Sequence, residues 1–540
     1  MQKVNARNKW SLAIGCVGRD LCYTLVSLFL LTYLQFTGLF NTTQFIVLSA
    51  IIVFCRVWDA INDPMMGTII TNTKTRFGKY RPWILIGAIL NSITLVLMFS
   101  VRLDSGWANV AFIGVMYLLW GMTYTMNDIA YWDLLPVLTS QKKERDNLTT
   151  LVAVFASVGA FASGGLIPII TPGNMVAAYR YISIIWALIF LGCQLLVFFG
   201  VHDNKHDKFI EPKMDHMDNV KDEKVTLKGM FKILIGNKQL MVMAIVVLLY
   251  SLGSAILNAF GQNFFYFKFG YTVSSNGAMA GGDMMFVFTV IYAVGTLVSQ
   301  AIYPFLASKF KRAVLVNYSM ILILIGYISF FFIANLLSGM VCFILLCILG
   351  VLIFAGQGVF YLTMLVMLTN TIEYGEWKTG KNNAAITFTI RPFMVKLAGA
   401  IQYGIVAITL LVCGLNMITD PVGEVEVAIG MFNEGTSVND CIAYLKELGH
   451  NSVEILKYQA LNPTSFTEGL KAYASSLFLG VNSGQIWGLT ASMCLAPVIM
   501  FIIAWVVLRK KYIIDEDMYE KIVQEISLRN NNNEMLKEEW

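Results

Sequence analysis

Long apolar runs separated by shorter polar connections dominate the pattern of residues along the chain. Each run reaches about 20 residues or more, the length that a helix needs to cross the hydrocarbon layer of a bilayer. The pattern predicts twelve membrane-spanning helices, with approximate limits 11–37, 44–71, 83–101, 108–136, 148–170, 178–201, 239–268, 283–306, 313–335, 341–369, 384–414 and 485–508. We therefore expect an all-α integral membrane protein. The first run lacks a small-residue cleavage site and is expected to be retained as a span.

A polar segment divides the predicted helices into two sets of six. This division predicts a six-helix bundle at 1–201, a cytoplasmic central loop at 202–238 and a second six-helix bundle at 239–508. An extracellular insertion at 416–484 interrupts the second bundle, and a cytoplasmic tail follows at 509–540. Two such bundles are expected to enclose a central cavity, with binding sites near the bilayer midplane between them.

Charge supports the membrane assignment and orients the chain. Only 14% of the residues are charged and 57% are hydrophobic, whereas soluble domains carry about 25% charged residues. Basic residues gather in alternate connections, with clusters at 3–9, 74–81, 142–145, 309–312, 378–381 and 509–511. By the positive-inside rule, these connections and both termini face the cytoplasm. We therefore expect a multi-pass protein of the cell membrane.

Cysteine and histidine usage argues against a metal centre or an enzyme. Of the nine cysteines, only Cys441 lies in a long polar stretch, and no C-x-x-C spacing occurs. The sequence contains neither H-E-x-x-H nor G-x-S-x-G, and its histidines lie in polar loops. No disulfide framework, zinc site or hydrolase centre is predicted. We also expect no cofactor and no nucleic-acid partner.

Charged residues inside the apolar runs are the informative exceptions. Asp20, Asp59, Asp63, Asp128 and Lys396 come from four different predicted spans. Counted from the cytoplasmic ends, all five lie roughly 14–20 Å deep, close to the middle of the bilayer. A lone charge at that depth is unfavourable by about 2.5–3.5 kcal/mol on insertion scales. We therefore expect these side chains to face an ion, a wet cavity or an opposite charge.

Two of these acids form a candidate cation site. Asp59 and Asp63 are four residues apart and share one helix face. With Asn62, and with Thr125 from the fourth span, they make an all-oxygen ligand set that suits Na⁺. One alternative is a fixed ion bridge to Arg56, although one basic residue cannot neutralise two acids. Another is a proton carried on one carboxylate.

A second set of residues suits a sugar. Arg19 and Asp20 lie on the first span, and Tyr124, Asp128 and Trp132 follow one another along the fourth. A carboxylate can accept from two neighbouring hydroxyls while an aromatic ring stacks on the apolar face of a pyranose. The alternative for Trp132 alone is an interfacial anchor.

Four stretches of the chain resemble a known family: "GRDLCYTLVSLFLLTYL", "RVWDAINDPMMGTIITNTKTRFGKYRPWILIG", "LLWGMTYTMNDIAYW" and "NTIEYGEWKTG". They are similar to the melibiose permease-like glycoside–pentoside–hexuronide:cation symporters of the major facilitator superfamily. The resemblance covers about residues 8–415 and the last span. It implies the major facilitator fold and cation-coupled sugar symport by alternating access.

Position by position, the resemblance assigns roles to individual residues. It implies a Na⁺ site at Asp59, Asn62, Asp63 and Thr125. It implies sugar contacts at Arg19, Asp20, Tyr124, Asp128 and Trp132. Tyr361 stands where those permeases have a tryptophan that flanks the sugar, and Lys396 matches a lysine between the two sites.

Three positions depart from the family pattern. Ala153 stands where a sugar-binding arginine is expected, Arg391 occurs where those permeases have an uncharged sugar contact, and Asn370 replaces an aspartate. The pocket is therefore expected to have a different charge layout. Arg391 would suit an anionic sugar such as a uronide, or would take over the missing arginine's work for a neutral glycoside, which we prefer.

The predicted outer insertion at 416–484 is long and acidic. Within it, "SVNDCIAYLKELG" and "NSVEILKYQALN" predict two short amphipathic helices, with Ser437 and Asn451 as N-caps and Gly449 as a stop. We interpret the insertion as a cap that shields the entrance. A role in capturing substrate or contacting a partner remains the alternative.

These observations predict a secondary active transporter that couples a glycoside or oligosaccharide to a monovalent cation, Na⁺ in preference to H⁺, and works as a monomer in the bilayer. Cation binding is expected to raise sugar affinity because Thr125 and Asp128 share one helix, and linkage requires the converse. The alternatives are an H⁺-coupled or exchange carrier for a hexuronide and a non-transporting sugar sensor with the same fold.

Overall fold

The computed structural model describes residues 4–73, 75–138, 142–201, 227–271, 279–380, 384–461 and 465–538. Within these ranges every regular element is a helix. The predicted central loop lies largely outside them.

Twelve of the described helices are long and apolar enough to cross a membrane, which confirms the predicted number and the all-α class. These spans are Ala6–Phe36, Thr42–Ile70, Arg81–Ser100, Gly106–Leu135, Asn147–Ile170, Met175–Gly200, Lys238–Phe269, Gly281–Lys309, Arg312–Leu336, Gly339–Thr379, Ile390–Val412 and Ser483–Lys511. The largest extension beyond the prediction is at the tenth span. Its helix continues ten residues past the apolar run, because a helix can extend beyond the membrane through a polar segment. It ends at Gly380, whose left-handed backbone (φ +70°) terminates the helix.

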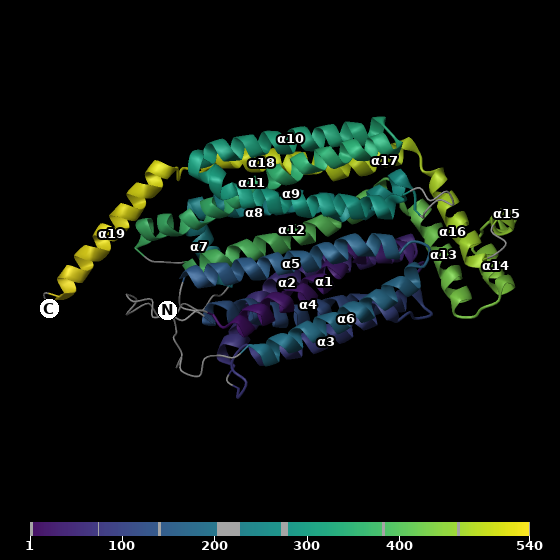
Figure 1. Ribbon diagram of the computed structural model, residues 1–540, viewed down its shortest axis with the longest axis horizontal. Coiled ribbons are helices and arrows are strands. Elements are labelled where there is room, and N and C mark those ends of the chain that lie inside the picture. Colours follow the sequence, from purple (N-terminus) through teal and green to yellow (C-terminus); the bar gives the residue numbers. More distant parts are fainter. Residues whose placement is uncertain are drawn as a thin grey trace. The chain divides into compact units, whose positions relative to one another are not determined.

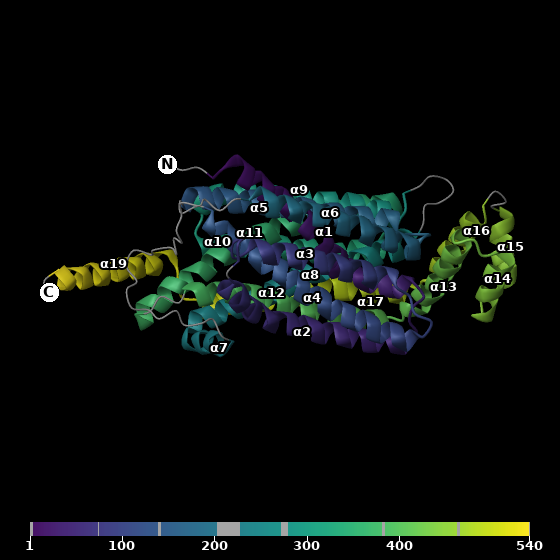
Figure 2. The same cartoon turned by 90° about the horizontal axis from the view of Figure 1, so that it is seen from below.

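The chain forms two compact units, and the helices α8 (Lys238–Phe269), α9 (Gly281–Lys309) and α12 (Ala384–Val412) contribute residues to both. Unit 1 comprises the described parts of Met1–Asn219, Ala259–Val290 and Tyr403–Leu489. Its first six helices lie side by side in Figures 1 and 2: α1 (Ala6–Phe36), α2 (Thr42–Asn72), α3 (Arg81–Ser100), α4 (Gly106–Val137), α5 (Lys142–Ile170) and α6 (Met175–Gly200).

Close approach at glycines holds α1 against its neighbours. A Cβ at Gly159 on α5 would lie 2.2 Å from the Val17 carbonyl oxygen on α1, and a Cβ at Gly18 would lie 2.8 Å from the Phe190 backbone on α6. Small residues let helix backbones approach in this way, as is typical of membrane-embedded interfaces.

Buried amides fix α4 within unit 1. The Asn127 amide donates to the Ile84 carbonyl on α3 at 2.7 Å and to the Gln194 side chain on α6 at 3.2 Å. Gln194 in turn donates to the Gly15 carbonyl on α1 at 2.8 Å. Asn127 and Gln194 are both 0% exposed, so unmaking these bonds would leave buried polar groups unsatisfied. The network therefore sets the rotation of α4, which carries four of the predicted site residues.

The insertion forms a helical cap at one end of unit 1, as both views show. It contains α13 (Asn416–Asn433), α14 (Val438–Glu447), α15 (Ser452–Leu461) and α16 (Phe466–Leu477). The two predicted helices are α14 and α15. Ser437 and Asn451 accept from backbone N–H groups at their starts, and Gly449 has φ +91°, which confirms the caps and the stop. The amphipathic pattern did not reveal α13 or α16.

Unit 2 comprises the described parts of Val220–Asn258, Ile291–Gln402 and Thr490–Trp540. Its elements include α7 (Leu227–Gly236), α10 (Arg312–Leu336), α11 (Gly339–Thr379), α18 (Ala496–Lys511) and α19 (Glu516–Glu538). In both views α19 runs away from the ends of α10 and α11. Tyr374 on α11 packs with Ile514 and Ile522 at the start of this helix.

Candidate functional site: two polar clusters on one helix

Thr125 brings the two predicted cation-binding acids together. Its hydroxyl oxygen lies 2.9 Å from Asp59 Oδ1 and 3.2 Å from Asp63 Oδ1. The single hydroxyl proton can be donated to one carboxylate at a time, so two like charges converge on one donor. Thr125 is 1% exposed and the two acids are half-buried. Two carboxylate oxygens that converge on one hydroxyl are a ligand arrangement that suits a small cation.

Asn62, the fourth predicted ligand, is buried at 7% exposure on the same helix. Among the described residues, the Thr125 hydroxyl contacts the two acids and not Asn62. The structure therefore brings together three of the four predicted oxygen donors.

Gly121 is a neighbour of this cluster that the sequence did not single out. It lies one turn before Thr125 on α4, and a Cβ there would be 3.6 Å from Asp59 Oδ1. The backbone of Gly121 therefore lies next to the carboxylate with no side chain beside it. A glycine inside an apolar helical run carries no distinctive signal, because it is also a common packing residue.

Aromatic rings surround Arg56, the alternative partner of the acids. Its guanidinium lies over Tyr403, 4.6 Å from the ring centroid, and near Tyr117 at 5.9 Å. Arg56 is 7% exposed, and its Nε and Nη2 atoms have no hydrogen-bond partner among the described residues. Arg56 precedes Asp59 by about 4.5 Å along the helix axis. The two rings and the guanidinium therefore form a layer next to the acids, on the side of the cap.

The second cluster centres on Arg19, which links two acids. Its Nη2 lies 2.8 Å from Asp20 Oδ2, and its Nη1 lies 2.9 Å from Asp128 Oδ1. Trp132 donates from its indole nitrogen to the same Asp128 oxygen at 3.1 Å. The guanidinium also lies over the Trp132 ring, 4.9 Å from the centroid. Arg19 is 2% exposed, whereas the Asp20 and Asp128 side chains are 21% and 31% exposed.

In these contacts one guanidinium pairs with two carboxylates. Every hydrogen bond that described residues donate to Asp20 ends on Oδ2, so its second oxygen is available as an acceptor. Cys16, which the sequence did not single out, is part of the cluster. Its sulfur lies 3.1 Å from Arg19 Nη2 and 3.3 Å from Asp20 Oδ2.

Tyr124 extends the second cluster as an aromatic group. Its ring lies 5.0 Å from Tyr23 on α1 and stacks on Trp120 at 5.6 Å. Tyr23 also stacks on Trp120 at 6.0 Å. Five predicted sugar contacts, at Arg19, Asp20, Tyr124, Asp128 and Trp132, thus lie on facing parts of α1 and α4.

The three other predicted sugar-site residues belong to unit 2 and are considered within it. Arg391 on α12 donates from Nη2 to the hydroxyl of Tyr361 on α11, and its guanidinium lies 5.7 Å from that ring's centroid. Both residues are half-buried, as is Lys396, which follows on α12. The structure therefore brings Tyr361 and Arg391 together and places Lys396 further along the same helix.

Unit 1 is closed at the end that carries the cap. Tyr403 donates from its hydroxyl to the carbonyl of Val26 on α1 at 2.8 Å. Asn263 on α8 donates to Gln35 on α1 at 3.2 Å, and Tyr266 donates to the Pro168 carbonyl on α5 at 2.9 Å. All these side chains are at most 5% exposed. By the predicted topology this is the extracellular end.

Comparison with known proteins identifies relatives. The family model described as MFS/sugar transport protein matches residues 11–430. The chain is 28% identical over 432 residues to the lactose permease of Lactobacillus delbrueckii subsp. bulgaricus, covering 76% of this chain and 64% of that one. It is 27% identical over 422 residues to the raffinose carrier protein of Pediococcus pentosaceus, covering 74% and 62%. The chain thus spans less than two thirds of the length of these two relatives.

Among solved structures, the chain resembles a bacterial homologue of the human lysosomal transporter Spinster in an inward-facing, unoccupied conformation. The TM-score is 0.55 at 12% identity, with 94% of this chain and 97% of that one covered. At this identity the likeness concerns the fold alone, which is that of the major facilitators.

Proposed function

Because the chain belongs to the MFS/sugar transport family, within the glycoside–pentoside–hexuronide:cation symporters, we propose that it carries a sugar across the cell membrane together with a monovalent cation. The family comprises transporters and not enzymes, and the twelve spans are those of a multi-pass membrane protein. The cation that we propose is Na⁺, and the sugar is a neutral glycoside or oligosaccharide.

One observation carries the proposal: α4 presents both clusters from adjacent turns. Thr125 contacts Asp59 and Asp63, while Asp128, one turn later, contacts Arg19. Any rotation or shift of α4 that improves the geometry of one cluster changes the other. The two binding sites are therefore coupled through a rigid element.

The coupling mechanism follows from charge. A cation between Asp59 and Asp63 relieves the repulsion of two carboxylates and fixes α2 against α4 through Thr125. Asp128 and Trp132 are then held in one position for the sugar. By linkage, the sugar tightens cation binding by the same factor. With both sites loaded, the two halves of the transporter exchange the side on which the site opens.

The contacts of Arg19 favour a neutral sugar over a uronide. Arg19 is engaged by Asp20 and Asp128, so its guanidinium is already paired and is a poor partner for a carboxylate on the substrate. Asp20 Oδ1 and the ring of Tyr124 offer an acceptor and an apolar surface instead. The relatives named lactose permease and raffinose carrier have names that denote neutral sugars. A hexuronide carrier would depend on Arg391, and it is the second candidate.

The experiment is uptake of labelled lactose, raffinose and glucuronide by vesicles that contain the purified protein. We expect accumulation of a neutral sugar under an inward Na⁺ gradient and none without it. Asp59→Cys and Asp63→Cys should abolish the Na⁺-driven accumulation while the protein stays in the membrane. Asp104→Asn, which changes an exposed acid between α3 and α4, is the matched control and should transport normally.

Other outcomes would identify the alternatives. Accumulation driven by a proton gradient alone would replace Na⁺ by H⁺, and selective glucuronide uptake would overturn the neutral sugar. Sugar binding without uptake would indicate a sensor. Full Na⁺-driven accumulation in either cysteine variant would refute the role of the acid pair.

A further inference from the structure

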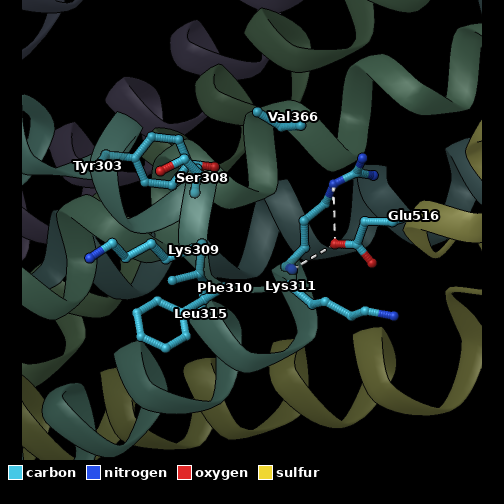
Figure 3. Close-up of a pocket in the computed structure, with 10 residues that line it drawn as sticks. Tyr303, Ser308, Lys309, Phe310, Lys311, Leu315, Val366 and Glu516 are labelled. Carbon is cyan, nitrogen blue, oxygen red and sulfur yellow. Dashed lines mark hydrogen bonds and ion pairs between the residues drawn. The ribbon is translucent and has the colours of Figure 1, made fainter.

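A cavity of about 420 Å³ lies in unit 2, where α9 ends and α10 begins. Figure 3 shows the residues around it, which come from the end of α9, the start of α10, α11 and α19. They are Tyr303, Ala307, Ser308, Lys309, Phe310, Lys311, Arg312, Leu315, Val366 and Glu516. Its volume falls within the range of small-molecule sites, about 300–1,000 Å³. Neither the cation cluster nor the sugar cluster uses any of these residues.

The lining is positively charged. Lys309, Lys311 and Arg312 face one carboxylate, Glu516, among the described residues that line the cavity. Glu516 accepts from the Arg312 backbone N–H at 2.7 Å and lies 3.7 Å from its guanidinium. The lining therefore has a net charge of +2, three cations less one anion. Asp517 lies 3.7 Å from Lys311, but both side chains are more than two-thirds exposed, and such pairs are weak.

Apolar surface continues from the cavity along both helices. On α9, Ile302 and Phe305 are 47% and 57% exposed, and on α10, Tyr318 and Ile321 are 64% and 50% exposed. Both helices are long and apolar enough to cross a membrane, and large apolar side chains exposed on such helices suit contact with lipid tails. The Lys309 ammonium lies over the Phe305 ring, 4.3 Å from its centroid, which puts a cation at the boundary between the cavity and this apolar face.

We propose that the cavity binds the headgroup of an anionic phospholipid, with the acyl chains lying along the exposed faces of α9 and α10. The phosphodiester oxygens would accept from the ammonium groups of Lys309 and Lys311, which make strong charge-assisted hydrogen bonds to phosphate. A basic pocket between helices at the cytoplasmic surface is the chemistry that recognises such headgroups. The proposal rests on the membrane topology of the proposed function, which puts this connection on the cytoplasmic side.

The apolar faces decide between a lipid and a free anion. A soluble phosphate would use the charges alone, and the adjoining apolar surface would contribute nothing to its binding. A phospholipid uses both, and its local concentration in the bilayer is high. In Figure 3 the Lys309 and Lys311 side chains point to different sides of the cavity. Their four-carbon stems rotate readily, so both ammonium groups can turn to one phosphodiester.

Glu516 gives the proposal a second, opposite test. Its carboxylate is held at the N-terminus of α10, where it is stabilised by the Arg312 N–H and by the helix dipole. It is thus a fixed negative charge in the wall of an anion site. Removing that charge should strengthen lipid binding, whereas removing the lysine charges should weaken it.

The test measures lipid binding by native mass spectrometry of the full-length protein in detergent, titrated with phosphatidylglycerol, phosphatidylcholine or inorganic phosphate. We expect phosphatidylglycerol to bind in preference to phosphatidylcholine. The double variant Lys309→Gln, Lys311→Gln should bind phosphatidylglycerol about 30-fold more weakly. Glu516→Gln should bind it about fivefold more tightly. The double variant Lys510→Gln, Lys511→Gln changes two exposed lysines at the end of α18, outside the cavity, and should match the unmodified protein.

Equal weakening by both double variants would show general surface attraction and overturn the proposal. Displacement of phosphatidylglycerol by millimolar phosphate would identify a free-anion site instead of a lipid site and would also overturn it. Because the readout is lipid binding, these outcomes do not depend on sugar uptake. Failure of this site and failure of the proposed transport function are therefore distinguishable.

Discussion

Two of the carboxylate sites in unit 1, at Glu426 and at the pair Asp59 and Asp63, make opposite use of the same functional group. Glu426 on α13 is 0% exposed and accepts from the Gly173 N–H at 2.8 Å, the Met175 N–H at 2.6 Å and the Tyr271 hydroxyl at 2.6 Å. The two N–H groups are fixed at the start of α6, where the helix dipole favours a negative charge. Asp59 and Asp63 are half-buried and converge on one rotatable hydroxyl.

The difference separates a structural site from a candidate functional one. The donors of Glu426 are fixed in number and direction, and neighbouring rings hold one of them, because Tyr271 packs against Phe36 at 5.6 Å and Phe478 at 5.0 Å. The two acids of the pair share the Thr125 hydroxyl, and Gly121 places no side chain beside Asp59. An arrangement with two adjacent charges gains from a bound cation, whereas one with three fixed donors needs no ligand.

The largest effect that tests this comparison is expected from Glu426→Ala. The change leaves two buried N–H groups and a buried hydroxyl without their acceptor, at a cost of about 3–5 kcal/mol. The cap should therefore separate from α6 and exchange its amide hydrogens faster. Hydrogen exchange followed by mass spectrometry on α13 and on the start of α6 measures this directly.

The matched control for that variant is Glu434→Ala. Glu434 lies in the same cap and pairs with Arg180 at 3.0 Å, but its side chain is 65% exposed, so its loss should cost at most about 1 kcal/mol. Equal protection in the Glu426 and Glu434 variants would contradict the structural role of Glu426.

A pH dependence of the cap is the next effect in size. Burial raises the pKa of Glu426 from 4.5 to about 7, against the hydrogen bonds from Tyr271, Met175 and Gly173 and the nearby charge of Lys471, which lower it. The docked state therefore binds a proton more tightly than an undocked one. Docking is strongest below about pH 4.5 and weakens as the pH rises to about 7, by up to about 3 kcal/mol.

Hydrogen exchange of the cap at pH 5.5 and pH 8, corrected for the intrinsic exchange rates, measures this trend. Burial likewise raises the pKa of Asp420 on α13 to about 6, against a hydrogen bond from Thr42 that lowers it, so it adds a smaller contribution of the same sign. In Glu426→Gln the Glu426 part of the dependence should vanish and the Asp420 part should remain. A cap that becomes better protected as the pH rises would show that the sign is wrong.

The sequence singled out the acid pair on α2 and did not single out Glu426, for a physical reason. Asp59 and Asp63 stand out because a carboxylate in an apolar run is costly and needs an explanation. Glu426 lies in a polar, acidic insertion, where a glutamate is ordinary, and its burial depends on contacts with α6 and Tyr271 that are distant in the sequence. The twelve spans followed from length and apolar content alone. Cys16 and Gly121 were missed because neither residue type is unusual in a membrane helix.

A smaller effect should separate the hydroxyl from the shape of Thr125. Thr125→Val keeps the volume but removes the group that contacts Asp59 and Asp63, so Na⁺ affinity should fall about 10- to 100-fold, the usual worth of a hydrogen bond to a charged group. Thr125→Ser keeps the hydroxyl and should stay within about threefold. The Na⁺ dependence of sugar uptake in vesicles gives both values. Equal affinity in the valine variant would remove Thr125 from the cation site.

Gly121→Ala is expected to have the smallest effect on Na⁺ affinity. It is also the most specific test of whether the ion lies on the Gly121 side of the acids. The new Cβ would lie 3.6 Å from Asp59 Oδ1, an ordinary van der Waals contact, so the helix should fold without strain. Alanine is also the better helix former by about 1 kcal/mol. The methyl group would nevertheless occupy space that a cation or its water needs, and Na⁺ affinity should fall about three- to tenfold.

Gly67→Ala on α2, where a Cβ meets nothing within 4 Å, is the matched control and should leave affinity unchanged. If Gly121→Ala binds Na⁺ as well as the unmodified protein does, the ion lies on the other side of the acids, and the contrast with the closed Glu426 site would rest on Thr125 alone.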